Sequence, residues 1–417
     1  MKNFLLLTIP ILFLVSCNSS FEDKKDKDDS LQYYPPTPVK IKKKEFRKYY
    51  RELSLFFDTT LINKGFNGGI LIAKDGQVIY EKYIGKTDLR KSDTLTDSTS
   101  LHIASTSKTF TATAILKLYE EKKLNLDDSL NKYFPDFPYK GITIKMLLNH
   151  RSGLQNYLYF ITKKIWNTIS AKHPGKKYIN NEDVLEILST VKPEISYPPD
   201  KRFSYSNTNY VLLAMIIEKV SGMTYPEYMQ HYIFDPLKMN HTFVYTSKDS
   251  SRAPASFYNK GTVWEPDFFD GTYGDKNIYS TPQDLLKWDQ ALYNPQFISP
   301  SLLDAAFSGY SFEKPTMHNY GLGWRLIFLP NGKKVVYHFG KWHGFNAAFS
   351  RLTDEKVTII ITGNKSNRTI YTAAHLCYDI FGDYQQHLLK EEPETDSLNT
   401  DKKSSASEIK SKIELSP

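Results

Sequence analysis

The sequence has little of what small disulfide-rich or metal-binding proteins are built from. Its 417 residues include two cysteines, Cys17 and Cys377, too few for a disulfide scaffold or a cysteine-ligated zinc site. Its ten histidines form no His-x-x-x-His pair and no Cys/His cluster with metal-ligand spacing. A phosphate-cradling glycine-rich loop of the P-loop type is also missing. We therefore expect no metal and no cofactor.

Positive charge is in modest excess, with a formal net charge of +8. Much of the excess lies ahead of the expected core, in Lys40, Lys42, Lys43, Lys44, Arg47 and Lys48. No zinc-finger, helix-turn-helix or aromatic RNA-binding sequence accompanies it. Because a run of charge alone more often marks a solvated face, we expect no nucleic-acid partner.

The apolar run from Phe4 to Val15 is too short to span a membrane, which takes about 20 residues, but it suits the core of a signal peptide. The residues Leu14-Val15-Ser16-Cys17 that end this segment resemble the lipobox of bacterial lipoproteins. That resemblance implies that residues 1–17 are a signal and that Cys17 carries a lipid anchor. The alternative is an ordinary secretory signal with a chance cysteine. We expect an exported protein held to the cell envelope, periplasmic or at the cell surface, with Cys377 buried and unpaired.

The two ends of the mature chain have the composition of flexible segments. Residues 18–44 are polar, charged and proline-containing, which indicates a linker between the anchor and the folded part. Residues 389–417 are rich in Lys, Ser and Glu, which predicts a disordered tail. The folded part is expected over 45–388.

Within 45–388 the apolar pattern alternates between helical and strand-like periods. We predict helices over 45–61 and 366–381, a further helix after Ser105, a hairpin over 70–80 around Asp75-Gly76, and strands over 335–338, 347–352 and 357–362. Strands thus lie at both ends, with a mostly helical middle. This order predicts an α/β (α+β) fold, an antiparallel sheet flanked by helices. The sheet part would span about 45–125 and 275–388, and the helical insertion about 126–274.

A candidate nucleophile stands in Ser105-Thr106-Ser107-Lys108. A serine hydroxyl needs a nearby base to attack at neutral pH, and residues three apart share one side of a helix, so Lys108 is within reach of Ser105. The same spacing recurs at Ser129–Lys132, Ser189–Lys192 and Ser311–Lys314. Context favours Ser105, because this residue opens a helix directly after a non-helical segment.

Two later segments offer matching groups. Tyr205 and Asn207 precede a helix, where the phenol could pass a proton to a leaving group and the amide could hold Lys108 and a substrate carbonyl. His338-Phe339-Gly340 ends a predicted strand, whose glycine would let backbone N–H groups approach a ligand. Either segment alone is as well explained by structural roles.

Taken together, the three segments resemble the motif set of the serine β-lactamase and penicillin-binding-protein family: Ser-x-x-Lys, Ser/Tyr-x-Asn and Lys-Thr-Gly or a variant. The tyrosine form is similar to the class C-like branch, which also holds DD-carboxypeptidases, D-aminopeptidases and esterases. Five further segments match in order, so the resemblance covers about residues 46–386: 142–154, 205–222, 235–239, 279–285 and 320–324.

The resemblance implies a role for each matching residue. Ser105 would be the acylated nucleophile, Lys108 its base and Tyr205 the general acid/base. Asn207 would position the substrate, and His338 stands where many members carry lysine. The backbone N–H groups of Ser105 and Lys341, next to Gly340, would form the oxyanion hole. His150, in the segment 142–154, is expected to be mainly structural.

The third motif departs from the β-lactamase pattern. His338 should be only partly charged at neutral pH, and Phe339 has no hydroxyl. A charge and a hydrogen bond worth roughly 1.5–3 kcal/mol would be missing from carboxylate recognition, so efficient β-lactam hydrolysis is not expected. Lys341 could restore some charge, and Trp342, His343 and Phe345 would give an aromatic rim.

Three hypotheses follow from this reading. The first is a serine hydrolase that forms a Ser105 acyl-enzyme with an ester or amide, taking a small-molecule or peptide substrate. The second is a DD-carboxypeptidase or D-aminopeptidase acting on cell-wall peptides. The third is a non-catalytic binding or sensor protein on the same scaffold. The sequence leaves the oligomeric state open.

Overall fold

A computed structural model describes residues 37–388 of the chain. The expected signal, Cys17, most of the linker and the whole C-terminal tail lie outside these residues. Within them, no helix combines the length and the apolar composition that crossing a membrane requires.

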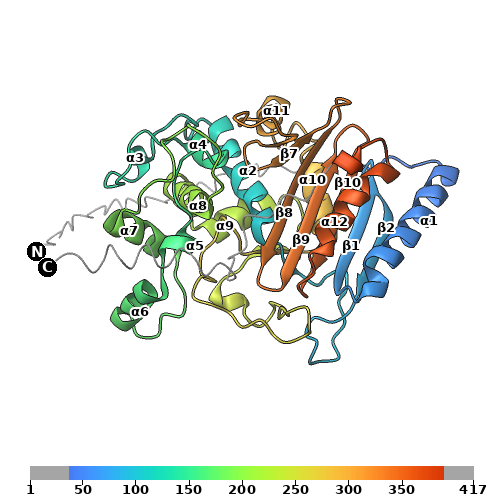
Figure 1. Ribbon diagram of the computed structural model, residues 1–417, viewed down its shortest axis with the longest axis horizontal. Helices are drawn as coiled ribbons and strands as arrows, with labels where there is room; N and C mark the ends of the chain where they lie inside the picture. Colours follow the sequence, from blue (N-terminus) through green and yellow to red (C-terminus); the bar gives the residue numbers. More distant parts are fainter. Residues whose placement is uncertain (1–36, 389–417) are drawn as a thin grey trace, which may run out of the picture.

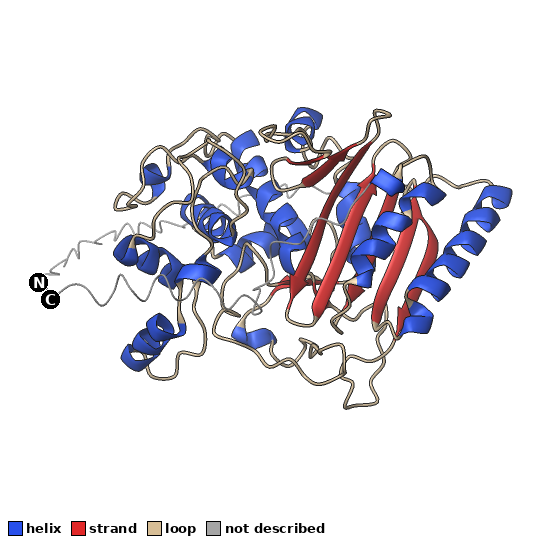
Figure 2. Ribbon diagram, in the orientation of Figure 1, coloured by secondary structure: helices blue, strands red, loops and turns tan. Residues whose placement is uncertain are grey.

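A seven-stranded antiparallel sheet forms the centre of the molecule, in the order β2-β1-β10-β9-β8-β7-β6 (Figure 2). Its strands are β1 Gly68–Lys74, β2 Gln77–Ile84, β6 His318–Tyr320, β7 Arg325–Phe328, β8 Lys334–Trp342, β9 Phe345–Leu352 and β10 Val357–Gly363. The predicted hairpin is confirmed as β1–β2. Asp75 and Gly76 both have positive φ, 49° and 75°, the combination that a two-residue turn requires. The three predicted late strands are confirmed as β8, β9 and β10.

The two faces of the sheet are covered by different helices (Figure 1). Helices α1 Lys43–Thr60 and α12 Thr369–Leu376 cover one face, where Ile70 and Ile72 point, and α10 Pro282–Ala291 packs against β1 and β10 on the other. The helix predicted over 366–381 is shorter than expected. It continues as a 3₁₀ turn, Tyr378–Ile380, which seats Tyr378 against the sheet with its hydroxyl 2.7 Å from Ser350 Oγ.

The middle of the chain is mostly helical and shares its core with the sheet. Leu71 and Phe349 of the sheet belong to the same buried cluster as Leu147, Leu213 and Ile233 of the middle region. The remaining helices are α2 Ser107–Glu120, α3 Leu130–Tyr133, α4 Ile144–Leu148, α5 Tyr157–Phe160, α6 Lys163–Lys172, α7 Asn181–Val191, α8 Asn207–Ser221, α9 Tyr225–Met229 and α11 Pro300–Ala306. Helices α2 and α8 pack against each other between the two regions.

A second, small sheet of three short strands lies beside the first residues of α2. It has the order β3-β5-β4, with β3 Leu101–His102, β4 Phe243–Val244 and β5 Ile278–Ser280. Strand β3 runs directly into the 3₁₀ turn Ala104–Thr106 that carries Ser105. The nucleophile candidate is therefore tied to segments from three distant parts of the chain.

Candidate active site

Ser105 and Lys108 are in contact at the start of α2. The Lys108 Nζ lies 2.9 Å from Ser105 Oγ and also donates to the carbonyl oxygen of Asp275, at 2.9 Å. Lys108 is fully buried, and Ser105 is 5% exposed. The predicted pairing of these two residues thus exists in the fold, with the lysine amine oriented by a second partner that no sequence motif indicated.

The turn ahead of Ser105 is strained and held in place by a histidine. Ala104 has a φ of +48°, a left-handed conformation that is uncommon for a residue with a side chain. Its N–H donates to His102 Nδ1 at 3.0 Å, so His102 Nε2 carries the proton toward Asn277 Oδ1, also at 3.0 Å. Burial lowers the pKa of His102 to about 3, which keeps the imidazole neutral and its Nδ1 an acceptor. The sequence did not indicate this role.

Tyr205 lies beside Lys108, as the motif order predicts. The centre of its ring is 5.0 Å from Lys108 Nζ, and it packs 4.2 Å from the ring of His150 and 5.2 Å from the guanidinium of Arg325. His150 is fully buried, and burial, with the nearby charge of Lys108, lowers its pKa well below the ordinary value. A neutral His150 packed under the Tyr205 ring fits the structural role expected of it.

Asn207 is the first residue of α8, two residues beyond Tyr205. Its side chain is 5% exposed, and its Oδ1 has no hydrogen-bond partner within residues 37–388. Burying an amide oxygen without a hydrogen-bond partner costs free energy. A hydrogen-bond donor from outside residues 37–388 would therefore stabilise this position.

Strand β8 passes directly over the Ser105 turn, and Gly340 makes this possible. A Cβ on Gly340 would lie 2.2 Å from the Ile103 carbonyl oxygen and 2.8 Å from the Ser105 amide nitrogen. Strand β7 pairs with β8 only as far as Arg325 opposite Tyr337, so the following residues of β8 have no β7 partner. The backbone at 340–341 therefore borders the Ser105 amide, as the oxyanion-hole prediction requires.

His338 differs from expectation in its charge. Its side chain is fully buried on β8, with Nε2 3.1 Å from the Tyr320 hydroxyl. Burial first, and then the charges of Arg325 and Lys108, lower the pKa of His338 well below its ordinary value. This direction argues against the expected partly charged imidazole at neutral pH, because the charges that act on His338 from residues 37–388 are cationic.

Phe339 points away from the site. Its ring stacks on Tyr371 of α12 at 5.3 Å and packs 5.0 Å from His375, on the opposite face of the sheet. The side chain at this position therefore does not face the Ser105 turn. Strand alternation places the Lys341 side chain on that same far face, so only the Lys341 backbone is turned to the Ser105 side.

Arg325 supplies positive charge that the motif analysis missed. It stands at the start of β7 beside Tyr205 and lines a pocket of about 550 Å³. The charged residues that line it are mostly cationic: Lys201, Arg202 and Lys314 accompany Arg325, and Glu313 is the one carboxylate among the lining residues. The nearest indication of Arg325 in the sequence is the family-like segment 320–324, which ends directly before this residue.

A larger cavity of about 960 Å³ lies beyond the other end of β8. The residues expected to form an aromatic rim, Trp342, His343 and Phe345, all line it. His102 also lines it, which places the cavity next to the turn that carries Ser105.

The amino-acid sequence is similar to those of a known family and of several known proteins. The model of the family described as "Beta-lactamase" matches residues 57–374. Penicillin-binding protein 4* of Bacillus subtilis is 34% identical over 343 residues, which is 78% of this chain and 74% of that protein. The protein Flp of Staphylococcus aureus strain MW2 is 29% identical over 72% of this chain, which spans 60% of Flp.

Solved structures show the same fold. The octameric penicillin-binding protein homologue from Pyrococcus abyssi superposes with a TM-score of 0.66 at 26% identity, over 78% of this chain and 76% of that one. The D-amino acid amidase from Ochrobactrum anthropi superposes with a TM-score of 0.65 at 20% identity, over 79% of this chain and 98% of that one. The predicted fold, an antiparallel sheet flanked by helices, is confirmed.

Proposed function

This chain belongs to the β-lactamase family, and we propose that it is a serine hydrolase in which Ser105 forms an acyl-enzyme with an ester or amide substrate. The observation that carries the proposal is the 2.9 Å contact between Lys108 Nζ and Ser105 Oγ, beside the ring of Tyr205. A lysine in a dry environment gives up its proton more readily than one in water, so it suits a base.

The geometry supports a two-step reaction. Lys108, as the free amine, would take the Ser105 proton while Oγ bonds to the substrate carbonyl carbon. The backbone N–H groups of Ser105 and Lys341 would stabilise the resulting oxyanion. Tyr205 would give its proton to the leaving group as the bond to carbon breaks and would take the proton held by Lys108 in its place. Water would then hydrolyse the ester on Ser105, with its proton returning to the Ser105 oxygen.

The Ser105 proposal is tested by active-site labelling. A fluorophosphonate should modify the folded protein at Ser105, as located by mass spectrometry of the labelled peptide, and Ser105→Ala should abolish both labelling and ester turnover. Ser189→Ala is the matched control, because Ser189 and Lys192 have the same spacing on α7. A folded protein that resists labelling, or a Ser105→Ala variant that still turns over substrate, would contradict the proposal and favour the binding-protein hypothesis.

A second candidate, a carboxypeptidase acting on D-amino-acid peptides, is favoured by the cationic pocket. Arg325 stands between this pocket and Tyr205, on the side where a leaving group would receive its proton. A peptide whose leaving residue ends in a free carboxylate would complement Arg325, Arg202 and Lys201. The B. subtilis relative is named as a penicillin-binding protein and the O. anthropi neighbour as a D-amino acid amidase.

We also propose export and lipid anchoring at Cys17. Support comes from the sequence Leu14-Val15-Ser16-Cys17 alone, which lies outside the described residues. If the proposal is right, Cys17→Ala should move the protein from the membrane fraction to the soluble fraction. Unchanged partitioning would contradict it.

A further inference from the structure

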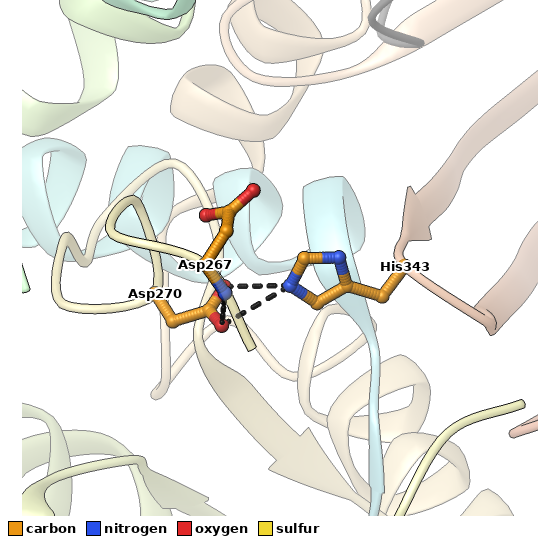
Figure 3. A group of neighbouring side chains, drawn as sticks. All are labelled: Asp267, Asp270 and His343. Carbon is orange, nitrogen blue, oxygen red and sulfur yellow. Dashed lines mark hydrogen bonds and ion pairs between the residues drawn. The ribbon is translucent and has the colours of Figure 1, made fainter. Parts of the chain in front are cut away.

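Three side chains that can bind a metal lie together at the end of β8, with His343 directed at the Asp270 carboxylate and the Asp267 carboxylate turned to one side of that pair (Figure 3). Asp267 and Asp270 belong to the loop before β5, and His343 forms the turn between β8 and β9. Their donor atoms all lie within 4.8 Å of one another. His343 Nε2 is 2.8 and 3.1 Å from the two oxygens of Asp270, a spacing that a single ion about 2.1 Å from each ligand can bridge.

The charges around this cluster do not balance. The Lys276 Nζ lies 3.6 Å from the carboxylate of Asp275, and its positive charge also acts on Asp267 and Asp270. Three carboxylates, those of Asp267, Asp270 and Asp275, thus share one ammonium and one imidazole. A divalent cation would remove this imbalance.

The surrounding contacts orient the carboxylates as a second shell does in metal sites. Trp342 Nε1 donates to Asp270 Oδ1 at 2.7 Å, and the Asp267 N–H donates to Asp270 Oδ2 at 2.9 Å. The Asn277 amide donates to the Asp270 carbonyl at 2.7 Å, and the Phe269 N–H to Asp267 Oδ1 at 2.8 Å. Within residues 37–388 no hydrogen bond occupies the other oxygen of Asp267. Partners of this kind fix ligand geometry and raise metal affinity.

We propose that Asp267, Asp270 and His343 bind a divalent transition-metal ion, Zn²⁺ or one with similar ligand preference. One imidazole with two carboxylates suits such ions, whereas Ca²⁺ and Mg²⁺ take all-oxygen sets. Binding replaces the imidazole proton that now bridges His343 and Asp270. Asp270 and His343 line the 960 Å³ cavity, so the remaining coordination positions are open to water or to a ligand oxygen.

The position of the site suggests what the ion would do. The loop that carries Asp267 and Asp270 continues to Asp275, whose carbonyl holds Lys108. His343 lies three residues beyond Gly340, in the turn that directly follows the strand bordering Ser105. The ion would therefore hold the loop with Asp267 and Asp270 close to the end of β8. These are the two segments that flank the nucleophile. Sequence spacing missed the cluster because His343 is 73 residues from Asp270.

The test is metal binding by the purified protein after chelator dialysis. Calorimetric titration with Zn²⁺ should give one site per chain, and Co²⁺ should give a visible absorption band from ligation. His343→Asn, which suits the left-handed backbone at this turn (φ +50°), should weaken Zn²⁺ binding about 100-fold, and Asp267→Asn at least about 10-fold. His173→Asn, at an exposed histidine, is the control and should change nothing.

Two results would overturn the site. One is the absence of a stoichiometric Zn²⁺ heat in the folded parent protein. The other is binding that both His343→Asn and Asp267→Asn leave unchanged, which would place the ion elsewhere. Because neither readout uses turnover, the outcome is independent of whether Ser105 is the nucleophile. Circular dichroism of each variant identifies any that fails to fold.

Discussion

At Gly340 the strand and the Ser105 turn approach so closely that no side chain fits between them. A methyl group there would overlap the Ile103 carbonyl oxygen at 2.2 Å, and backbone atoms on both sides would have to move. We expect Gly340→Ala to lower kcat about 100-fold, because a misplacement of about 1 Å at reacting groups has this effect. Steady-state kinetics on an ester substrate would measure it.

Gly332→Ala is the control for this prediction. Gly332 faces open space, although its φ of +86° is strained for alanine, so this variant should lose about 1 kcal/mol of stability and keep its activity. If Gly340→Ala folds and retains full kcat, the approach of β8 to Ser105 is not needed for catalysis.

Single residues also show what the sequence could predict. The Ser105–Lys108 contact followed from their helical spacing. The close approach of Gly340 followed from a glycine near a predicted strand, although β8 continues to Trp342 and does not end at Gly340. The faces of β8 could have been predicted as well, since adjacent residues alternate and His338 and Phe339 must point apart. The neutral charge of His338 could not, because it depends on burial and on Arg325, which carries no motif.

Strand β7 is short, yet it positions the charge that distinguishes the two candidate substrates. Arg325 begins the strand and lies beside Tyr205. We expect Arg325→Gln to lower kcat/KM about 10- to 100-fold for a D-alanyl-D-alanine peptide with a free carboxylate, the value of one charge-assisted hydrogen bond. The same peptide as its C-terminal amide should be much less affected. Kinetics on the two peptides measure the ratio.

Comparing kcat/KM for the two peptides separates a loss of carboxylate recognition from a disturbance of Tyr205. A disturbance of Tyr205 would slow hydrolysis of both peptides alike. Arg51→Gln, on the outer surface of α1, should leave both rates unchanged. Equal losses on acid and amide would remove the support for a carboxylate-bearing leaving group while leaving the Ser105 proposal standing.

Among the elements, long periodic segments were predictable and short ones were not. Helix α1 and strands β8, β9 and β10 were found because each repeats its apolar period several times. The strands β3, β4 and β6, of two or three residues, contain too little pattern to detect, and β3 and β4 pair with β5, which is distant from both in the sequence. The Asp275 carbonyl and His102 belong to this part of the fold, so both were missed.

Across the whole molecule, buried neutral histidines link stability to pH. Burial lowers the pKa of His102 to about 3 and that of His375 to about 4, and it lowers those of His150 and His338 well below the ordinary value. In the unfolded chain each would titrate near 6.5. The unfolded state therefore binds more protons than the folded state below pH 6.5, so stability must fall as the pH decreases.

We expect the free energy of unfolding to decrease between pH 7 and pH 5, with each histidine adding a slope that approaches about 1.4 kcal/mol per pH unit. His375 offers the clearest test because it lies on α12, on the face of the sheet opposite Ser105, and its Nε2 is buried without a hydrogen-bond partner among the described residues. His375→Phe should lower the slope of the free energy of unfolding against pH by the contribution of nearly one proton. Urea unfolding at several pH values measures this slope. His173→Gln, at an exposed position, should leave it unchanged. A slope that His375→Phe leaves unchanged would mean that this imidazole is protonated in the folded protein, and that burial does not set its charge.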